Sequence, residues 1–149
     1  PVLADCFPQM RYVHVVRNGL DMAFSTNTWQ ARHWWSHFGL APPDASALPV
    51  HQLQFWTASN RAILDHGAAR LAGRCLVVSF EAFCADPDRQ SRRLRGFLGL
   101  PDQPHRPEVP LSPSGIGRAG ARDMSQFPPA LVRAAQELQS EVNCLAFQE

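Results

Sequence analysis

The segment Arg11–Thr28, RYVHVVRNGLDMAFSTNT, predicts a strand, a tight turn and a helix in direct succession. Tyr12–Val16 is rich in β-branched and aromatic residues, which favour extended structure, and Asn18-Gly19 interrupts that pattern. Asp21–Ser25 is typical of the first turns of a helix, which we expect to continue to about Trp35. In open α/β sheets, ligands bind outside the carboxyl ends of the strands, so the end of this strand is a candidate site.

Two polar residues mark that candidate site. Arg17 closes the strand and Ser25 follows eight residues later. A guanidinium beside free amide groups and a hydroxyl suits an anion, and phosphate in particular. In the alternative interpretation, Arg17 pairs with a carboxylate and Ser25 is an ordinary helix residue.

Composition places the chain among globular proteins. Its 149 residues suffice for one domain with a core and are too few for two comfortable ones, and 45% of them are hydrophobic. A net charge of +1 gives no general argument for nucleic acid or an anionic membrane, so we expect neither as a partner. The cysteines have no metal-ligand or disulfide spacing, so we predict no metal site and a reducing, cytoplasmic compartment. They are Cys6, Cys75, Cys84 and Cys144.

The stretch HVVRNGLDMAFS resembles the 3′-phosphate-binding segment of sulfotransferases that use 3′-phosphoadenosine 5′-phosphosulfate. In that family an arginine closes a strand and a serine eight residues later shares the 3′-phosphate of the nucleotide. Arg17 and Ser25 fall on those two positions. The usual turn is Arg-Asp followed by Pro or Gly, so Asn18 departs from the pattern by removing a charge. The resemblance implies 3′-phosphoadenosine 5′-phosphosulfate as the co-substrate.

A second strand is predicted after a long helix. Apolar residues recur at three- and four-residue steps over His51–Ala72, and Cys75–Phe80 is an apolar run, so we expect a parallel, right-handed crossover. Trp56 and Asn60 match a Trp-x3-Asn pattern of bacterial sulfotransferases, and we expect the Asn60 amide to bond to backbone. His14, in the middle of the first strand, is expected to be a satisfied core histidine and not a catalytic base. Both faces of that strand are largely apolar, which predicts helices on both sides.

The stretch FEAFCADPDRQSRRLRGFLGLP, residues 80–101, resembles another family segment, in which Tyr/Phe-Glu-Asp-Leu precedes a proline, a helix and Phe-Leu-Gly-Leu. Asp86 and Pro87 predict the helix start and Gly99 its end. In the family the aromatic residue at the position of Phe80 lies near the adenine. Phe80 can stack there but has no hydroxyl for a hydrogen bond.

The third matching segment is Ile116-Gly117-Arg118-Ala119. Sulfotransferases place a basic, glycine-containing loop here that closes over the 3′-phosphate, and bacterial relatives often carry Ile-Gly-Arg-Trp. The resemblance implies that amides near Gly115 and Gly117, with Arg118 as a second cation, complete a phosphate clamp, and Arg122 is a spare candidate.

Three further segments complete the predicted organisation. The aromatic run at residues 29–38 is expected to pack and to line an acceptor pocket. Residues 39–50 and 100–126 are predicted loops, and the second contains prolines at every third position from Pro101 to Pro113, which indicates a stiff connector or, alternatively, a ligand for an SH3-like partner. The last helix starts at Pro128-Pro129 and buries Leu131, Ala135, Leu138 and Val142.

Taken together, the resemblance implies an α/β fold, a P-loop-like three-layer domain with a parallel sheet, present over residues 1–149 as a single partial domain. No GxxxxGK-type loop occurs in the sequence, whereas the family carries a 5′-phosphosulfate loop and a catalytic basic residue upstream of the Arg17-type strand. We therefore expect the carboxyl-terminal portion of a sulfotransferase domain, inactive alone, with an unknown catalytic residue. The missing amino-terminal half of the same domain is a candidate partner.

The implied reaction is transfer of a sulfuryl group to a hydroxyl or amine acceptor, which could be a small molecule, a glycan or a peptide. The implied nucleotide-binding residues are Arg17, Ser25, Phe80, Gly117 and Arg118. One alternative is a non-catalytic module that binds a nucleotide or a protein. Another is a relative of the P-loop kinases, for which a complete GxxxxGK[ST] loop would be expected.

Overall fold

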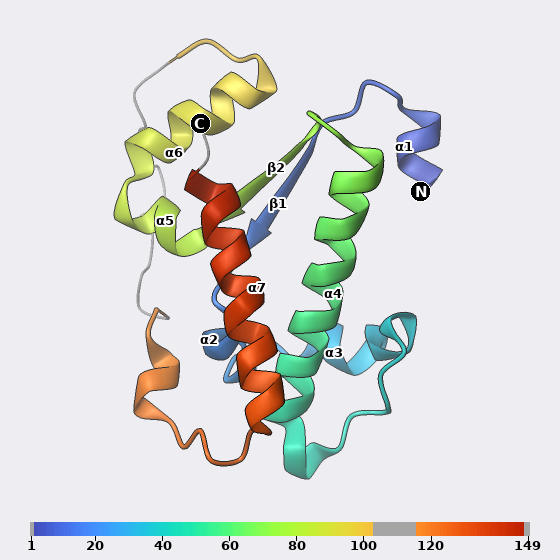
Figure 1. The fold of residues 1–149 in the computed structure, drawn as a ribbon, viewed down its shortest axis with the longest axis vertical. Helices are drawn as coiled ribbons and strands as arrows, with labels where there is room; N and C mark the ends of the chain where they lie inside the picture. The colour runs from blue at the N-terminus through green and yellow to red at the C-terminus, as the bar shows by residue number, and fades with distance from the viewer. Residues whose placement is uncertain (1, 103–115, 148–149) are drawn as a thin grey trace.

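The computed structural model describes residues 2–102 and 116–147, and Figure 1 shows two adjacent strands surrounded by helices. Strands β1 (Tyr12–Val16) and β2 (Cys75–Ser79) pair in parallel, with Tyr12 opposite Cys75 and Val16 opposite Ser79. The long helix α4 (Leu48–Arg70) connects them, so the predicted strand–helix–strand unit is confirmed. The other elements are α1 (Val2–Cys6), α2 (Gly19–Ala23), α3 (Trp29–Trp34), α5 (Phe80–Ala85), α6 (Pro87–Leu98), α7 (Pro129–Phe147) and the 3-10 helices η1 (Trp35–Phe38), η2 (Ala45–Ala47) and η4 (Arg118–Ala121).

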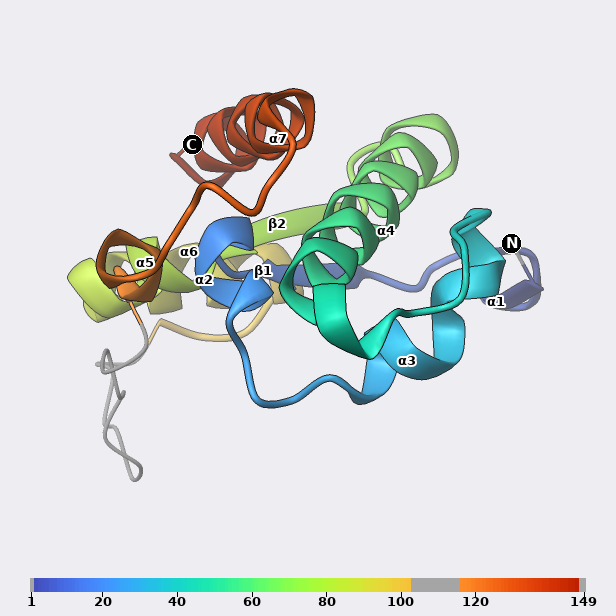
Figure 2. The ribbon, with the colours of Figure 1, turned by 90° about the horizontal axis from the view of Figure 1, so that it is seen from below.

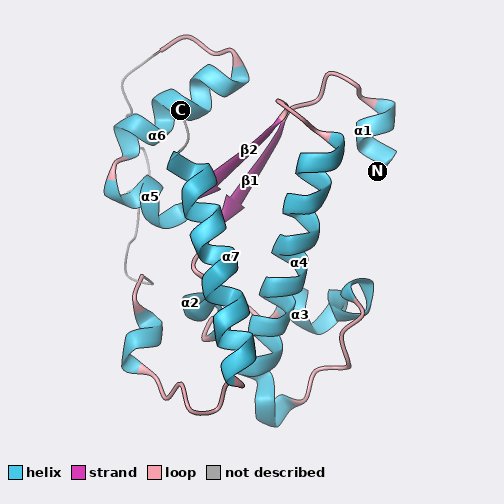
Figure 3. Cartoon of the chain, in the orientation of Figure 1, coloured by secondary structure: helices cyan, strands magenta, loops and turns pink. Residues whose placement is uncertain are grey.

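Helices α4 and α7 lie on the same face of the strand pair, as the view in Figure 2 shows. The core forms between them and the strands, from Val16, Val77, Leu53, Trp56, Leu64, Leu138 and Val142. On the other face Leu76 and Val78 are buried, whereas Val15 is 62% exposed. Within the described residues, coverage of β1 on both sides is therefore incomplete. The mixture of helices with a parallel sheet fits the predicted α/β class (Figure 3), while the three-layer, P-loop-like arrangement stays a prediction.

The predicted helix from Asp21 to about Trp35 is wrong, because α2 ends at Ala23 and α3 begins at Trp29. A side chain of α4 takes over the hydrogen bonds that would have continued the helix. The Gln52 amide donates to the carbonyl oxygens of Ala23, at 2.8 Å, and Ser25, at 3.3 Å. Ser25 consequently lies outside any helix.

Two other boundaries also differ from the prediction. The loop expected at residues 39–50 ends early, because Asp44 caps η2 and α4 already begins at Leu48. Phe80 opens α5 and does not belong to β2, because the Ser79 hydroxyl accepts a hydrogen bond from the Ala82 amide and starts the helix. Of the predicted loop 100–126, the prolines from Pro104 to Pro113 and Gly115 lie outside the described residues.

The caps of α6 agree with the prediction. The Asp86 carboxylate accepts a hydrogen bond from the Arg89 amide at 3.0 Å, Pro87 occupies the first turn, and Gly99 ends the helix with φ = 72°. Helix α7 begins at Pro129 and buries Ala135, Leu138 and Val142, also as predicted, whereas Leu131 is only half-buried.

His14 is a satisfied core residue, as predicted. Its Nε2 lies 2.8 Å from Oδ1 of Asn60, whose amide nitrogen donates to the Trp56 carbonyl at 2.7 Å. Because the Asn60 nitrogen is engaged as a donor, Oδ1 is the acceptor and His14 Nε2 carries the proton. Burial lowers the pKa of His14, and the bond to Asn60 opposes that effect.

Gly19 follows the Asn18 N-cap and lies against the indole of Trp56. A Cβ atom at position 19 would lie 2.5 Å from Trp56 Cε3 and 2.7 Å from Cδ2. The glycine is therefore required by this close approach.

We predict that Gly19→Ala destabilises the fold by about 1–3 kcal/mol, because the indole or α2 has to move. Gly96→Ala is the matched control, since position 96 is also helical and a Cβ there would meet nothing within 4 Å. Removing a helical glycine at such an open site should stabilise the chain by up to about 1 kcal/mol. Urea denaturation would measure both changes, and equal stability of the two variants would contradict the packing of Trp56 on Gly19.

A second prediction concerns acid stability. Because the pKa of His14 is lowered in the folded state, the unfolded chain takes up a proton first as the pH falls through about 6.5, and folding stability falls with it. The loss ends once the pH drops below the folded pKa. Urea midpoints measured between about pH 7.5 and 5 should fall less steeply in His14→Gln than in the wild type. His37→Gln, which changes an exposed histidine, should keep the wild-type slope, and an unchanged slope in His14→Gln would contradict this assignment.

Candidate active site

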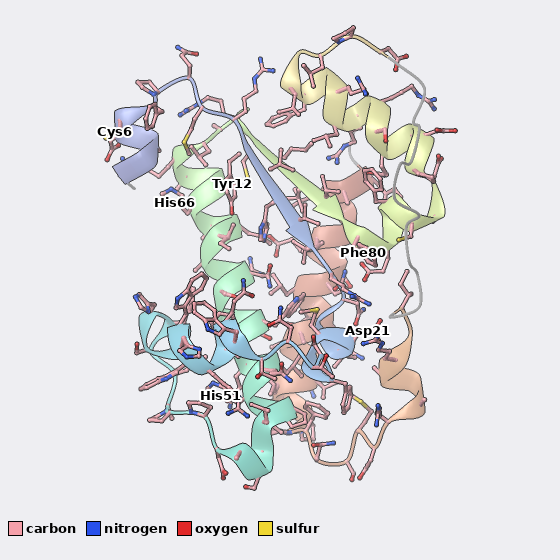
Figure 4. All side chains as sticks on the ribbon, turned by 180° about the vertical axis from the view of Figure 1, so that it is seen from behind. Cys6, Tyr12, Asp21, His51, His66 and Phe80 are labelled. Atoms are coloured by element: carbon pink, nitrogen blue, oxygen red, sulfur yellow. The ribbon has the colours of Figure 1, made fainter. Side chains whose placement is uncertain are left out.

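The strand register brings Arg17 and Phe80 together. Val16 lies opposite Ser79, so the residues that follow the two strands, Arg17 and Phe80, lie at the same end of the sheet. The Arg17 guanidinium carbon lies 4.8 Å from the centre of the Phe80 ring, within the range of a cation–π interaction. In Figure 4, Phe80 and Asp21 are labelled near this end of the strands and Tyr12 near the opposite end.

The Arg17 side chain has no anionic partner in the described part of the chain. The three ion pairs found there involve Arg61 and Arg70, not Arg17. The Arg17 Nε atom is buried and has no hydrogen-bond acceptor. The alternative in which Arg17 pairs with a carboxylate is therefore not supported. A buried guanidinium nitrogen without an acceptor is the kind of group that a bound anion satisfies.

Glu81 joins the two turns that follow the strands. One carboxylate oxygen accepts from the Asn18 amide at 2.8 Å, and the other accepts from the Ser79 hydroxyl at 3.1 Å. Asn18 in turn caps α2 through its side-chain oxygen, which accepts from Leu20 and Asp21. Sequence reasoning matched Glu81 to a family motif but gave it no role. Ser79 is two residues from Glu81 in the sequence, whereas Asn18 is 63 residues away. The contact with Asn18 could therefore be found only in the folded structure.

Trp56 supports the same turn from α4. Its indole nitrogen donates to the Arg17 carbonyl at 2.9 Å, while its ring packs on Gly19. The predicted Trp-x3-Asn pair therefore serves two neighbouring points of β1, since Trp56 contacts its end and Asn60 contacts His14 in its middle. Trp56 is a structural support for the backbone beside Arg17.

Ser25 and Arg118 form no hydrogen bond or ion pair with Arg17 in the described residues. The Ser25 hydroxyl accepts from the Asn27 amide at 3.2 Å, which leaves its proton free to donate. Arg118 is exposed on η4, and Arg122 lies over the Phe24 ring at 5.8 Å. The structure thus joins Arg17 with Phe80, and in the described residues no hydrogen bond or ion pair links Ser25 or Arg118 to that pair.

The resemblance implies that amides near Gly115 and Gly117 bind phosphate, and in this structure the Gly117 amide already has a partner within the protein. That amide donates to the Asp21 carboxylate at 2.7 Å. The amide of Ala119 donates to the other carboxylate oxygen at 2.9 Å. A carboxylate of the protein itself therefore satisfies the Gly117 amide, whereas Gly115 lies outside the described residues.

A cavity of about 350 Å³ lies beside β1 and reaches Arg17. Helices α3, η1 and α4 form its other walls, with Trp34 and Phe38 from the aromatic run and Asn27, Gln30 and Asn60 as neutral polar groups. The prediction that the aromatic run lines a pocket is met by Trp34 and Phe38. The described residues contain no group of three or more His, Cys, Asp or Glu side chains able to hold a metal ion. None of the described helices has the length and apolarity needed to cross a membrane.

Comparison with known proteins gives one match. A family model for the sulfotransferase family matches residues 1–104 of the 149, a segment that contains Arg17, Ser25, Phe80 and Glu81. Arg118 and α7 lie beyond the matched segment. Neither the curated proteins nor the solved structures contain a match to this chain. Because the match covers more than two thirds of the sequence and spans both strands, this chain belongs to the sulfotransferase family.

Proposed function

We propose that this chain binds the nucleotide of 3′-phosphoadenosine 5′-phosphosulfate for sulfuryl transfer to a hydroxyl or amine acceptor, with Arg17 as the main ligand of the 3′-phosphate. Family membership supports sulfuryl transfer in general. The choice of this nucleotide rests on the resemblance of Arg17 to the arginine that binds the 3′-phosphate in the family, and the position of Arg17 directly after β1 supports it.

The observation that carries the proposal is the unsatisfied guanidinium of Arg17. Its Nε is buried without an acceptor, and its flat face is already held on Phe80, so its orientation is fixed before a ligand arrives. A planar, fixed fork of donors binds a phosphate through two parallel hydrogen bonds. Phe80 would also offer an aromatic edge to the adenine.

In this proposal the residues named so far bind and orient the nucleotide. Ser25 lies eight residues after Arg17 in the sequence, and its hydroxyl accepts from the Asn27 amide, so its proton can be donated to a phosphate oxygen. Sulfuryl transfer, like phosphoryl transfer, depends mainly on positioning and charge stabilisation. The base that activates the acceptor is not assigned to any residue of this chain.

The cavity beside β1 is proposed to receive the acceptor. Arg17 contributes to its wall, so a molecule bound there lies next to the proposed nucleotide site. Its aromatic and carboxamide walls suit a neutral molecule with a hydroxyl or amine group.

We predict that Arg17→Ala weakens binding of 3′,5′-adenosine bisphosphate by about 1.5–3 kcal/mol, roughly 10- to 150-fold, because it removes charge-assisted hydrogen bonds. Calorimetric titration would measure the affinity for the bisphosphate and, separately, for 5′-AMP, which lacks the 3′-phosphate. The wild-type chain should prefer the bisphosphate, and Arg17→Ala should lose that preference.

Arg11→Ala is the matched control for this prediction. Arg11 precedes the opposite end of β1 and also lies over a phenylalanine ring, that of Phe97 at 5.8 Å. The substitution Arg11→Ala removes the same charge and a similar stacking contact at the other end of β1. The preference for the bisphosphate over 5′-AMP should therefore persist in this variant. Equal binding of the bisphosphate and 5′-AMP by the wild type, or an unchanged preference in Arg17→Ala, would reject the assignment of Arg17.

A further inference from the structure

The Asp21 carboxylate connects two segments that are almost 100 residues apart. Its side chain is on α2, and the residue is only 5% exposed. One oxygen accepts from the Gly117 amide at 2.7 Å and the other from the Ala119 amide at 2.9 Å. In the described residues Asp21 forms no ion pair with a lysine, arginine or histidine. Its charge is therefore compensated by two backbone amides of the turn at residues 116–121.

The conformation of this turn explains why the two amides point to one anion. Gly117 has φ = 77° in the left-handed region, and the residues after it form the 3-10 helix η4. A left-handed residue next to right-handed ones turns successive N–H groups toward a common point, where an anion is favoured. Short hydrogen bonds from both amides to a carboxylate are charge-assisted, and burial strengthens them.

Arg118 lies between the two amides that Asp21 holds. Its backbone is therefore fixed relative to α2 and to the end of β1, while its side chain remains exposed. Without the Asp21 carboxylate, the turn would lose its two hydrogen bonds to α2, those from the Gly117 and Ala119 amides. Arg122, which lies over Phe24, would remain as a weaker link.

We propose that Asp21 is a positioning residue: it fastens the 116–121 turn, and with it Arg118, to α2, which begins two residues after Arg17. The fastening is independent of any ligand. The benefit to nucleotide binding rests on the function proposed above. Asp21 itself stays bound to the amides and does not contact the nucleotide.

The test begins with Asp21→Asn, which keeps the size of the side chain but places an NH₂ group against one of the two amides. Hydrogen exchange of the Gly117 and Ala119 amides, measured by NMR, should accelerate about ten-fold or more, the effect of losing roughly one charge-assisted hydrogen bond. Asp123→Asn is the matched control, because that exposed carboxylate in the same loop bonds to the nearby Ser125 and not to the amides of Gly117 or Ala119. It should leave exchange at positions 117 and 119 unchanged.

Gly117→Ala provides a second variant that leaves α2 intact. A Cβ at this position meets nothing within 4 Å, but φ = 77° disfavours alanine, so the turn itself should loosen. Faster exchange of the Ala119 amide in this variant would support the proposal even if Asp21→Asn folds poorly. Wild-type exchange rates at both amides in either folded variant would overturn it.

A double-mutant cycle then tests the positioning of Arg118. In the wild-type background, Arg118→Ala should weaken binding of 3′,5′-adenosine bisphosphate, whereas in Asp21→Asn it should change the affinity less than two-fold. Equal losses in both backgrounds would mean that Asp21 only stabilises the fold, and would overturn the positioning role. If the wild type shows no preference for the bisphosphate over 5′-AMP, the proposed function fails, and the exchange experiment alone decides whether Asp21 holds the turn.

Discussion

The contact between Trp56 and the turn after β1 is the constraint on which the site depends. The indole donates to the Arg17 carbonyl and its ring occupies the space that any side chain at Gly19 would need. The hydrogen bond from the indole sets the distance between the turn and α4. The indole ring sets how closely α2 can pack against α4 at Gly19. Because this hydrogen bond holds the backbone of Arg17, Trp56 on α4 helps to position the Arg17 side chain over Phe80. Trp56 also lines the cavity beside β1, so one side chain shapes both parts of the proposed site.

The acidic and basic groups at the strand end have different kinds of partner. Asp21 and Glu81 are the first acidic residues after β1 and β2, and both accept hydrogen bonds from backbone amides. Glu81 satisfies an amide of the turn after β1, and Asp21 satisfies two amides of the turn at residues 116–121. Neither forms an ion pair with Arg17, which interacts with the face of an aromatic ring. The acidic groups therefore organise the backbone while the positive charge remains available, which is the condition that an anion site needs.

Local sequence signals were sufficient for the parts of the fold that local interactions determine. The strand at Tyr12–Val16, the caps of α6 and the meeting of the two strand ends all follow from residue type, capping chemistry and parallel pairing. The break between α2 and α3 could not be predicted in this way, because the Gln52 amide that ends α2 comes from α4. The role of Asp21 could not be predicted for the same reason, because the sequence placed this residue only in the first turn of a helix. Its partners are the amides at 117 and 119, and no pattern of side chains identifies a backbone donor so distant in sequence.

This bond also connects the part of the chain that the family match covers to the part that it does not. The segment matched by the family model, residues 1–104, contains Arg17, Phe80 and Asp21, whereas Gly117 and Arg118 lie after that segment. Resemblance of short motifs assigned Gly117 to phosphate through its amide, and the structure assigns that amide to Asp21. The glycine is still required, because φ = 77° brings the two amides onto one carboxylate. The Gly117 amide is thus used within the protein, and a role of this segment toward a ligand would fall to the exposed side chain of Arg118.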